Sequence, residues 1–191
     1  MSTALTDDPS TRSMRLHLNL ALQGQTAALA GDHSEALELY REAINLAVST
    51  RAPEVFFRYY TQCVLESLER TGSYAEIIEF CVAADQHHQT IEEPLPIHRE
   101  DHASILERLG VAQLKAGERQ NAHQSLTRAV EIATEKLPVS TELLGWLNRG
   151  YQVDARRIDQ LQEGHRYFVV RPDNQSPPDL DSATSTNGPT Q

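Results

Sequence analysis

The sequence predicts an all-α protein, an α-solenoid of antiparallel helical hairpins with about seven helices. Three observations predict it. Long helical patterns fill most of the chain, short glycine-containing breaks separate them in pairs, and similar residue types recur at fixed distances from each break. We expect the helices over seven ranges: 14–30, 33–50, 53–71, 74–89, 97–116, 119–136 and 140–164.

The three breaks carry Gly31, Gly72 and Gly117, each between two long helical patterns. A glycine at such a place can take the left-handed conformation that ends one helix, and the next residues can open another. Two further glycines, Gly24 and Gly110, stand seven residues before the first and the third break. Each break therefore predicts the turn of a helical hairpin.

Residues after the breaks recur in register. The positions five, nine and twelve residues after each break are small or apolar: Ala36, Tyr40 and Ala43; Ile77, Cys81 and Ala84; Ala122, Leu126 and Ala129. Small residues there let two antiparallel helices approach closely, while the larger residue fills the layer between hairpins. The recurrence therefore indicates packing rather than chemistry.

This pattern resembles the tetratricopeptide repeat in a long-helix variant, over roughly residues 14 to 136. The family's small or apolar signature positions are occupied by Leu20, Gln23, Gly24, Ala27, Ala36, Tyr40 and Ala43; by Thr61, Val64, Leu65, Leu68, Ile77, Cys81 and Ala84; and by Leu106, Leu109, Gly110, Gln113, Ala122, Leu126 and Ala129. The spacing exceeds the usual 34 residues, and longer helices can absorb the excess. The resemblance implies three repeats, at about 14–50, 53–89 and 97–136.

The remaining segments complete the domain organisation. An amphipathic helix at 140–164 fits the capping role that the end of a solenoid needs, so the helical domain spans 14–166. The polar residues 1–13 are expected to be flexible. The stretch 171–191, rich in Pro, Ser, Thr, Asn and Asp, is expected to be a disordered tail because it lacks apolar residues to bury.

Composition excludes several classes of function. The chain of 191 residues carries a formal net charge of -10, which disfavours nucleic acid and anionic membranes as main partners. No apolar run approaches the roughly 20 residues needed to span a bilayer, and the N-terminus lacks the apolar stretch of a secretory signal. The two cysteines, Cys63 and Cys81, lie within helical patterns and are interpreted as buried thiols in a reducing compartment. We expect a cytoplasmic protein.

Motifs of catalysis are missing from the sequence. It contains no phosphate-binding loop, no Gly-x-Gly-x-x-Gly and no Gly-x-Ser-x-Gly. We therefore expect no enzyme, no catalytic residues and no cofactor.

One cluster, His98-Arg99-Glu100-Asp101-His102, places two histidines on one helical face, as metal ligands often are. Neither order of the zinc-protease motifs fits, because Arg99 follows the first histidine and Asp101 precedes the second. A metal-binding protein at His98 and His102 is kept as a minor alternative, beside the reading of a polar first helical turn.

The resemblance also implies which residues line a concave groove that binds a partner. They are Leu18, Gln25 and Leu29; Tyr59, Gln62, Glu66, Glu69 and Arg70; and Glu107, Val111 and Lys115. This surface is apolar at one end and acidic in its middle. Ala21 and Gln25 occupy two positions of the clamp that holds a C-terminal carboxylate in chaperone-docking relatives, so that clamp is not assembled.

The leading hypothesis is a non-catalytic protein–protein interaction module: an adaptor, scaffold, assembly factor or chaperone. Its partner would be another protein or peptide, a helix or extended segment with apolar anchors and some basic character, bound in the groove. The alternative is a peptide- or ligand-sensing regulatory protein that acts through a separate effector chain. A subunit of a larger complex also fits the sequence.

Overall fold

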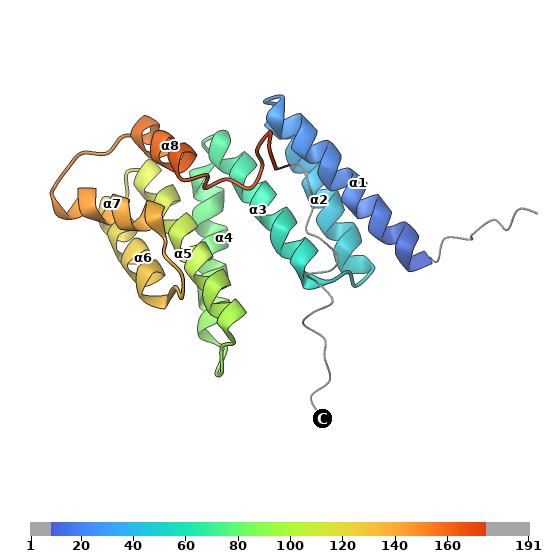
Figure 1. Ribbon diagram of the computed structural model, residues 1–191, viewed down its shortest axis with the longest axis horizontal. Helices are drawn as coiled ribbons and strands as arrows, with labels where there is room; N and C mark the ends of the chain where they lie inside the picture. The colour runs from blue at the N-terminus through green and yellow to red at the C-terminus, as the bar shows by residue number, and fades with distance from the viewer. Residues whose placement is uncertain (1–8, 175–191) are drawn as a thin grey trace, which may run out of the picture. The chain divides into compact units, whose positions relative to one another are not determined.

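The computed structural model describes residues 9–174, and over this range the protein is all-α, as the sequence predicts (Figure 1). The described part contains eight helices and no strand. They are α1 (Pro9–Leu29), α2 (His33–Ser49), α3 (Glu54–Arg70), α4 (Tyr74–Gln89), α5 (Pro96–Lys115), α6 (Arg119–Ile132), α7 (Pro138–Asn148) and α8 (Ala155–Gly164).

The chain divides into two compact units. Of the described residues, unit 1 comprises 9–71 and 169–174, and unit 2 comprises 72–168. Unit 1 therefore contains α1, α2 and α3 together with the segment that follows Phe168, and unit 2 contains α4 to α8. The division falls between α3 and α4, so the two helices of the second expected repeat belong to different units.

Unit 1 is built on α2, which packs against α1 and against α3, and Figure 1 shows the three helices side by side. A Cβ atom built on Gly24 of α1 would stand 2.6 Å from Cε1 of Tyr40 on α2. Because Tyr40 is fully buried against this glycine, the absence of a side chain at position 24 is what permits the close approach of the two helices. A second cluster, around Phe56 and Tyr60, fills the other end of the unit.

Unit 2 is built on α5, which packs against α4, α6, α7 and α8. The contact between α5 and α6 repeats the one in unit 1, since a Cβ atom on Gly110 would stand 2.5 Å from Cγ of Leu126. The core joins these helices to the two that follow. Its buried members are Val111, Leu114, Ala122, Leu126, Val139, Leu143, Leu147, Ile158 and Leu161.

The helix ends confirm the expected role of the glycine breaks. Gly31, Gly72 and Gly117 have φ of +86°, +76° and +86°, the left-handed conformation that glycine adopts without a steric penalty. At the first break Asp32 N donates to Ala27 O at 2.9 Å and Gly31 N donates to Ala28 O at 3.0 Å. These two bonds satisfy carbonyl groups at the end of α1 and turn the chain into α2.

Three expected boundaries are wrong. The helix expected at 119–136 ends at Ile132, because Ala133 has φ -57° and ψ 134° and leaves the helical conformation. The first helix begins at Pro9, so residues 9–13 are helical rather than flexible; proline is well accepted in the first turn, where its missing N–H is not needed. Residues 1–8 lie outside the described range. The expected helix 140–164 is two helices, because Gly150 has φ +74°, and Asp154 then accepts a hydrogen bond from Arg157 N and opens α8.

The segment after α8 also differs from expectation where the structure describes it. Residues 171–174, the start of the expected disordered tail, form a turn in which Asn174 N donates to Arg171 O at 3.0 Å. The Asn174 side chain also donates to Val169 O at 2.8 Å. The rest of that expected tail lies outside the described residues.

From residue 9 to residue 174, no helix combines the length and the hydropathy needed to cross a membrane.

Candidate binding surface

Glu66 of α3 is one of the residues expected to line the groove, and it lies in unit 1. Its carboxylate accepts hydrogen bonds from two successive backbone N–H groups, Val169 N at 2.6 Å and Val170 N at 3.0 Å. Glu66 is only 4% exposed, and a buried carboxylate is costly unless it receives such bonds. Bonds from N–H groups to an ionised acceptor are about twice as strong as those between neutral groups. Glu66 thus holds a short stretch of main chain.

The side chains of the same two valines meet an apolar cluster formed by all three helices of unit 1. Val169 and Val170 pack against a cluster whose buried members are Ala27 of α1, Ala36 and Tyr40 of α2, and Cys63 of α3. We call Glu66 and these four residues the Glu66 surface. It combines a charged acceptor for the main chain with an apolar wall for side chains.

Local helix geometry explains why α3 contributes so much to this surface. Tyr59, Cys63 and Glu66 follow one another at steps of four and three residues, which places them on one face of a helix. The Tyr59 hydroxyl accepts a hydrogen bond from Gln25 Nε2 at 2.6 Å. Burial raises the pKa of Tyr59, as do nearby Cys63 and Glu66, while the positive charge of Arg171 acts in the opposite direction. Gln25, Tyr59 and Glu66 are therefore brought together, as expected from the sequence.

Gln25 has a further property that bears on binding. Its side chain is 2% exposed, and its Oε1 atom has no hydrogen-bond partner within residues 9–174. A buried acceptor without a donor costs free energy relative to the hydrated, unfolded state. The Gln25 amide thus has an acceptor beside Tyr59 that a donor could satisfy.

The other expected groove residues of unit 1 are more dispersed. Leu18 is half-buried and packs on the cluster around Phe56 and Tyr60. Leu29 is 38% exposed and Gln62 is half-buried. Glu69 is buried, whereas its neighbour Arg70 is exposed.

In unit 2 the expected groove residues of α5 face the chain's own C-terminal helices. Glu107 accepts hydrogen bonds from Ser140 of α7, at 3.0 Å from the backbone N and 2.7 Å from Oγ. Val111 is fully buried in the core of unit 2. Lys115 donates to Asp159 Oδ1 at 2.6 Å and to Gln162 Oε1 at 2.9 Å, both on α8. This face of α5 is thus interior to unit 2.

Burial determines the electrostatics of that interior face. It raises the pKa of Glu107, and the hydrogen bonds from Ser140 oppose the shift without cancelling it. The Lys115 side chain is only 3% exposed, so its ion pair with Asp159 lies largely out of water at one end. Within unit 2, the Glu107 side chain therefore bonds α7 and the Lys115 side chain bonds α8.

The histidine cluster of the sequence lies in unit 2, where it joins three helices. His102 Nε2 of α5 lies 2.6 Å from Asp85 Oδ1 of α4, and Arg128 of α6 donates to both oxygens of the same carboxylate at 2.8 Å. Burial alone raises the pKa of Asp85, but the hydrogen bonds from Arg128, His102 and Gln89 outweigh it and lower that pKa. The network ties α4, α5 and α6 together.

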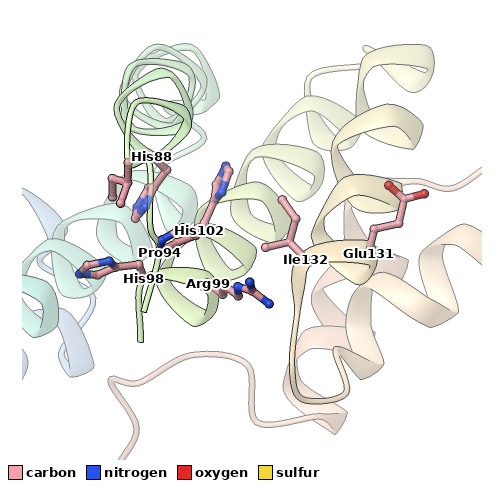
Figure 2. A pocket seen from close by; sticks show the side chains of 8 residues that line it. His88, Pro94, His98, Arg99, His102, Glu131 and Ile132 are labelled. Carbon is pink, nitrogen blue, oxygen red and sulfur yellow. The ribbon is translucent and has the colours of Figure 1, made fainter. Parts of the chain in front are cut away.

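A hollow of about 320 Å³ opens beside this network (Figure 2). His88 stacks on His102 with ring centroids 4.9 Å apart, and His98 Nδ1 accepts a hydrogen bond from Leu95 N at 3.3 Å. Its lining residues are His88, Ile91, Pro94, His98, Arg99, His102, Glu131 and Ile132. Over the described residues, no three His, Cys, Asp or Glu side chains are arranged to hold a metal ion. His98 thus takes part in a hydrogen bond, and His102 takes part in a hydrogen bond and in ring stacking.

Comparison with known proteins finds no matching family model, no matching curated protein and no matching solved structure. The resemblance to the tetratricopeptide repeat therefore stays a proposal that rests on the residues of this chain.

Sequence reasoning missed the occupant of the Glu66 surface. Val169 and Val170 lie more than one hundred residues after Glu66, at the point where the composition turns polar. The only signal is the run Phe168-Val169-Val170, an apolar tripeptide just before Pro172. Asp85, the carboxylate at the centre of the α4–α5–α6 network, carried no signal at all.

Proposed function

We propose that this protein is a non-catalytic protein-interaction module, and that its Glu66 surface binds a bent, non-helical segment of a partner protein. The observation that carries the proposal is the pair of successive backbone N–H groups held by the Glu66 carboxylate. A main chain that bends at this point turns two successive N–H groups to the same side, so a surface that binds it needs an acceptor that reaches both and an apolar wall beside it. The Glu66 surface supplies both.

The chemistry of the Glu66 surface indicates which kind of segment it binds. Backbone N–H groups are common to all residues except proline, so the Glu66 contact selects a conformation rather than a sequence. The apolar wall adds a preference for aliphatic side chains. The net charge of -10 favours a partner with some basic residues. An adaptor, scaffold, assembly factor or chaperone binds partners in this manner.

We further propose a solenoid of tetratricopeptide type as the architecture and the cytoplasm as the location. The paired contacts of Gly24 with Tyr40 and of Gly110 with Leu126, at the same offsets from their helix breaks, support the repeat. Two buried free cysteines, Cys63 and Cys81, support a reducing compartment.

Peptide selection tests the proposed function. Random decapeptides displayed on phage are selected against the full chain with Val170→Pro, which removes one of the two N–H donors of the chain's own segment from Glu66, and the affinity of each selected peptide is then measured by fluorescence anisotropy. We expect peptides with consecutive aliphatic residues whose affinity falls about tenfold or more when Glu66→Gln is added, because a charge-assisted acceptor is lost.

The matched control is Glu38→Gln, the same change at an exposed glutamate of α2 in the same unit. It should leave the affinities unchanged. Selected peptides that bind Val170→Pro equally well with and without Glu66→Gln, or a selection against Val170→Pro that yields no binder, would contradict the proposal.

A further inference from the structure

The segment Val169–Asn174 occupies the Glu66 surface of its own chain. We infer that this segment is an internal ligand, and that a partner binds by displacing it with a bent segment of the same chemistry. The inference rests on the proposed function and adds to it the composition of the partner segment and the control of access.

The contacts of the segment define what a competitor must offer. Val169 and Val170 present two adjacent N–H groups to Glu66 and two aliphatic side chains to the apolar cluster. Arg171 follows, and its Nε donates to Asp173 Oδ1 at 3.2 Å, within the segment. The partner segment is therefore two successive aliphatic residues at a bend of the main chain, neither of them proline.

Much of the segment is accessible to solvent. Val169 and Val170 are only half-buried, and Pro172 and Asp173 are exposed. The carbonyl oxygen of Val169 is bonded within the segment itself, by the Asn174 side chain at 2.8 Å. Release of the segment breaks its two main-chain bonds to Glu66 and exposes two half-buried valines, while its internal turn can persist.

Tethering makes this internal ligand effective in spite of its small contact. A linked segment acts at an effective concentration that reaches millimolar values for short linkers, so a free segment of equal intrinsic affinity binds poorly. A partner gains an advantage where it makes contacts that the internal segment does not make.

Displacement is tested in the full chain with a fluorescein-labelled peptide that has the sequence of residues 166–174. Val170→Pro removes one of the two N–H donors from the internal segment and leaves the helices unaltered. We expect weak binding of the peptide by wild type, binding about tenfold tighter or more by Val170→Pro, and loss of that gain in the double variant Val170→Pro with Glu66→Gln.

A peptide with proline in place of its second valine is the matched control and should bind neither protein. A second variant, Val169→Asp, releases the segment by charge repulsion from Glu66 and should give the same gain. Thermal melts of each variant check that the fold is kept.

The outcomes separate the two proposals. If Val170→Pro and Val169→Asp bind the peptide no better than wild type while phage-selected peptides still depend on Glu66, the internal-ligand inference is wrong and the proposed function stands. If no peptide depends on Glu66 in any of these proteins, both are wrong.

Discussion

The two units of this protein are completed by neighbouring parts of the same C-terminal region in different ways. Unit 2 is completed by α7 and α8, which contribute five buried side chains to its core: Val139, Leu143, Leu147, Ile158 and Leu161. Unit 1 receives the short non-helical segment from Val169 to Asn174, with two half-buried valines. Large apolar burial makes the first an inseparable part of the fold. In our proposal the second opens by itself.

A buried glutamate takes part in both arrangements. Glu107 accepts from the backbone and side chain of Ser140, and Glu66 accepts from the backbones of Val169 and Val170. The polar contact is thus similar, and the difference lies in the apolar surface that surrounds it. The same acceptor chemistry therefore serves structure in unit 2 and, in our proposal, exchangeable binding in unit 1.

The largest expected effect is the loss of core packing in unit 2. Leu143→Ala removes a fully buried side chain and should lower the free energy of unfolding by about 2–5 kcal/mol. Val169→Ala, the comparable change in the segment of unit 1, should lower it by about 1 kcal/mol or less. Urea denaturation measures both.

Leu95→Ala, at a residue 58% exposed, is the control and should change stability by less than about 0.5 kcal/mol. Equal losses for Leu143→Ala and Val169→Ala would remove the distinction between the two units.

A smaller effect on stability tests the close approach of two helices at a glycine, which both units contain. Gly24→Ala and Gly110→Ala would place a Cβ atom 2.6 Å from Tyr40 and 2.5 Å from Leu126, and overpacking of this kind costs about 1–3 kcal/mol. Gly145→Ala in α7 meets nothing within 4 Å and should stabilise by about 0.5–1 kcal/mol, the ordinary gain from glycine to alanine within a helix. Thermal or urea unfolding distinguishes the signs. A stabilising Gly24→Ala or Gly110→Ala would show that the helices do not approach closely there.

The smallest effect is a pH dependence that involves both units. Burial lowers the pKa of His17 in unit 1 and of His88 in unit 2, where neighbouring histidines add to the shift. The unfolded chain then binds more protons than the folded chain as the pH falls below about 6.5, so the free energy of unfolding decreases in that range. The raised pKa of Glu107 acts in the opposite direction, because its protonated form is favoured in the fold.

Urea denaturation between pH 8 and pH 5.5 measures this dependence. His17→Phe and His88→Gln should each lose less stability over that range than wild type, each compared with its own value at pH 8, where imidazoles are neutral. Unchanged slopes in both variants would contradict the assignment.

The local part of the fold was predictable and the long-range part was not. The glycine breaks predicted the hairpin turns, because a left-handed glycine is a property of a few adjacent residues. The contact of Glu66 with Val169 joins residues 103 positions apart through backbone atoms, which every sequence supplies alike. The break at Gly150 was missed because the apolar spacing continues across it, from Leu147 to Ile158.

The candidate binding surface was likewise predictable only in part. The repeat pattern placed Gln25, Tyr59 and Glu66 on one face, and they lie together. The repeat pattern could not indicate that α7 and α8 cover the corresponding face of α5, because that depends on which later helix packs where.

Amide hydrogen exchange of the full chain tests most directly whether the segment in unit 1 opens independently. We expect the amides of Val169 and Val170 to exchange through a local opening, with far lower protection than the amides of Leu126 and Leu143 and with little dependence on low concentrations of urea. Protection equal to that of Leu126, with the full urea dependence of global unfolding, would show that the segment is as integral to the fold as α7 and α8, and would contradict the account.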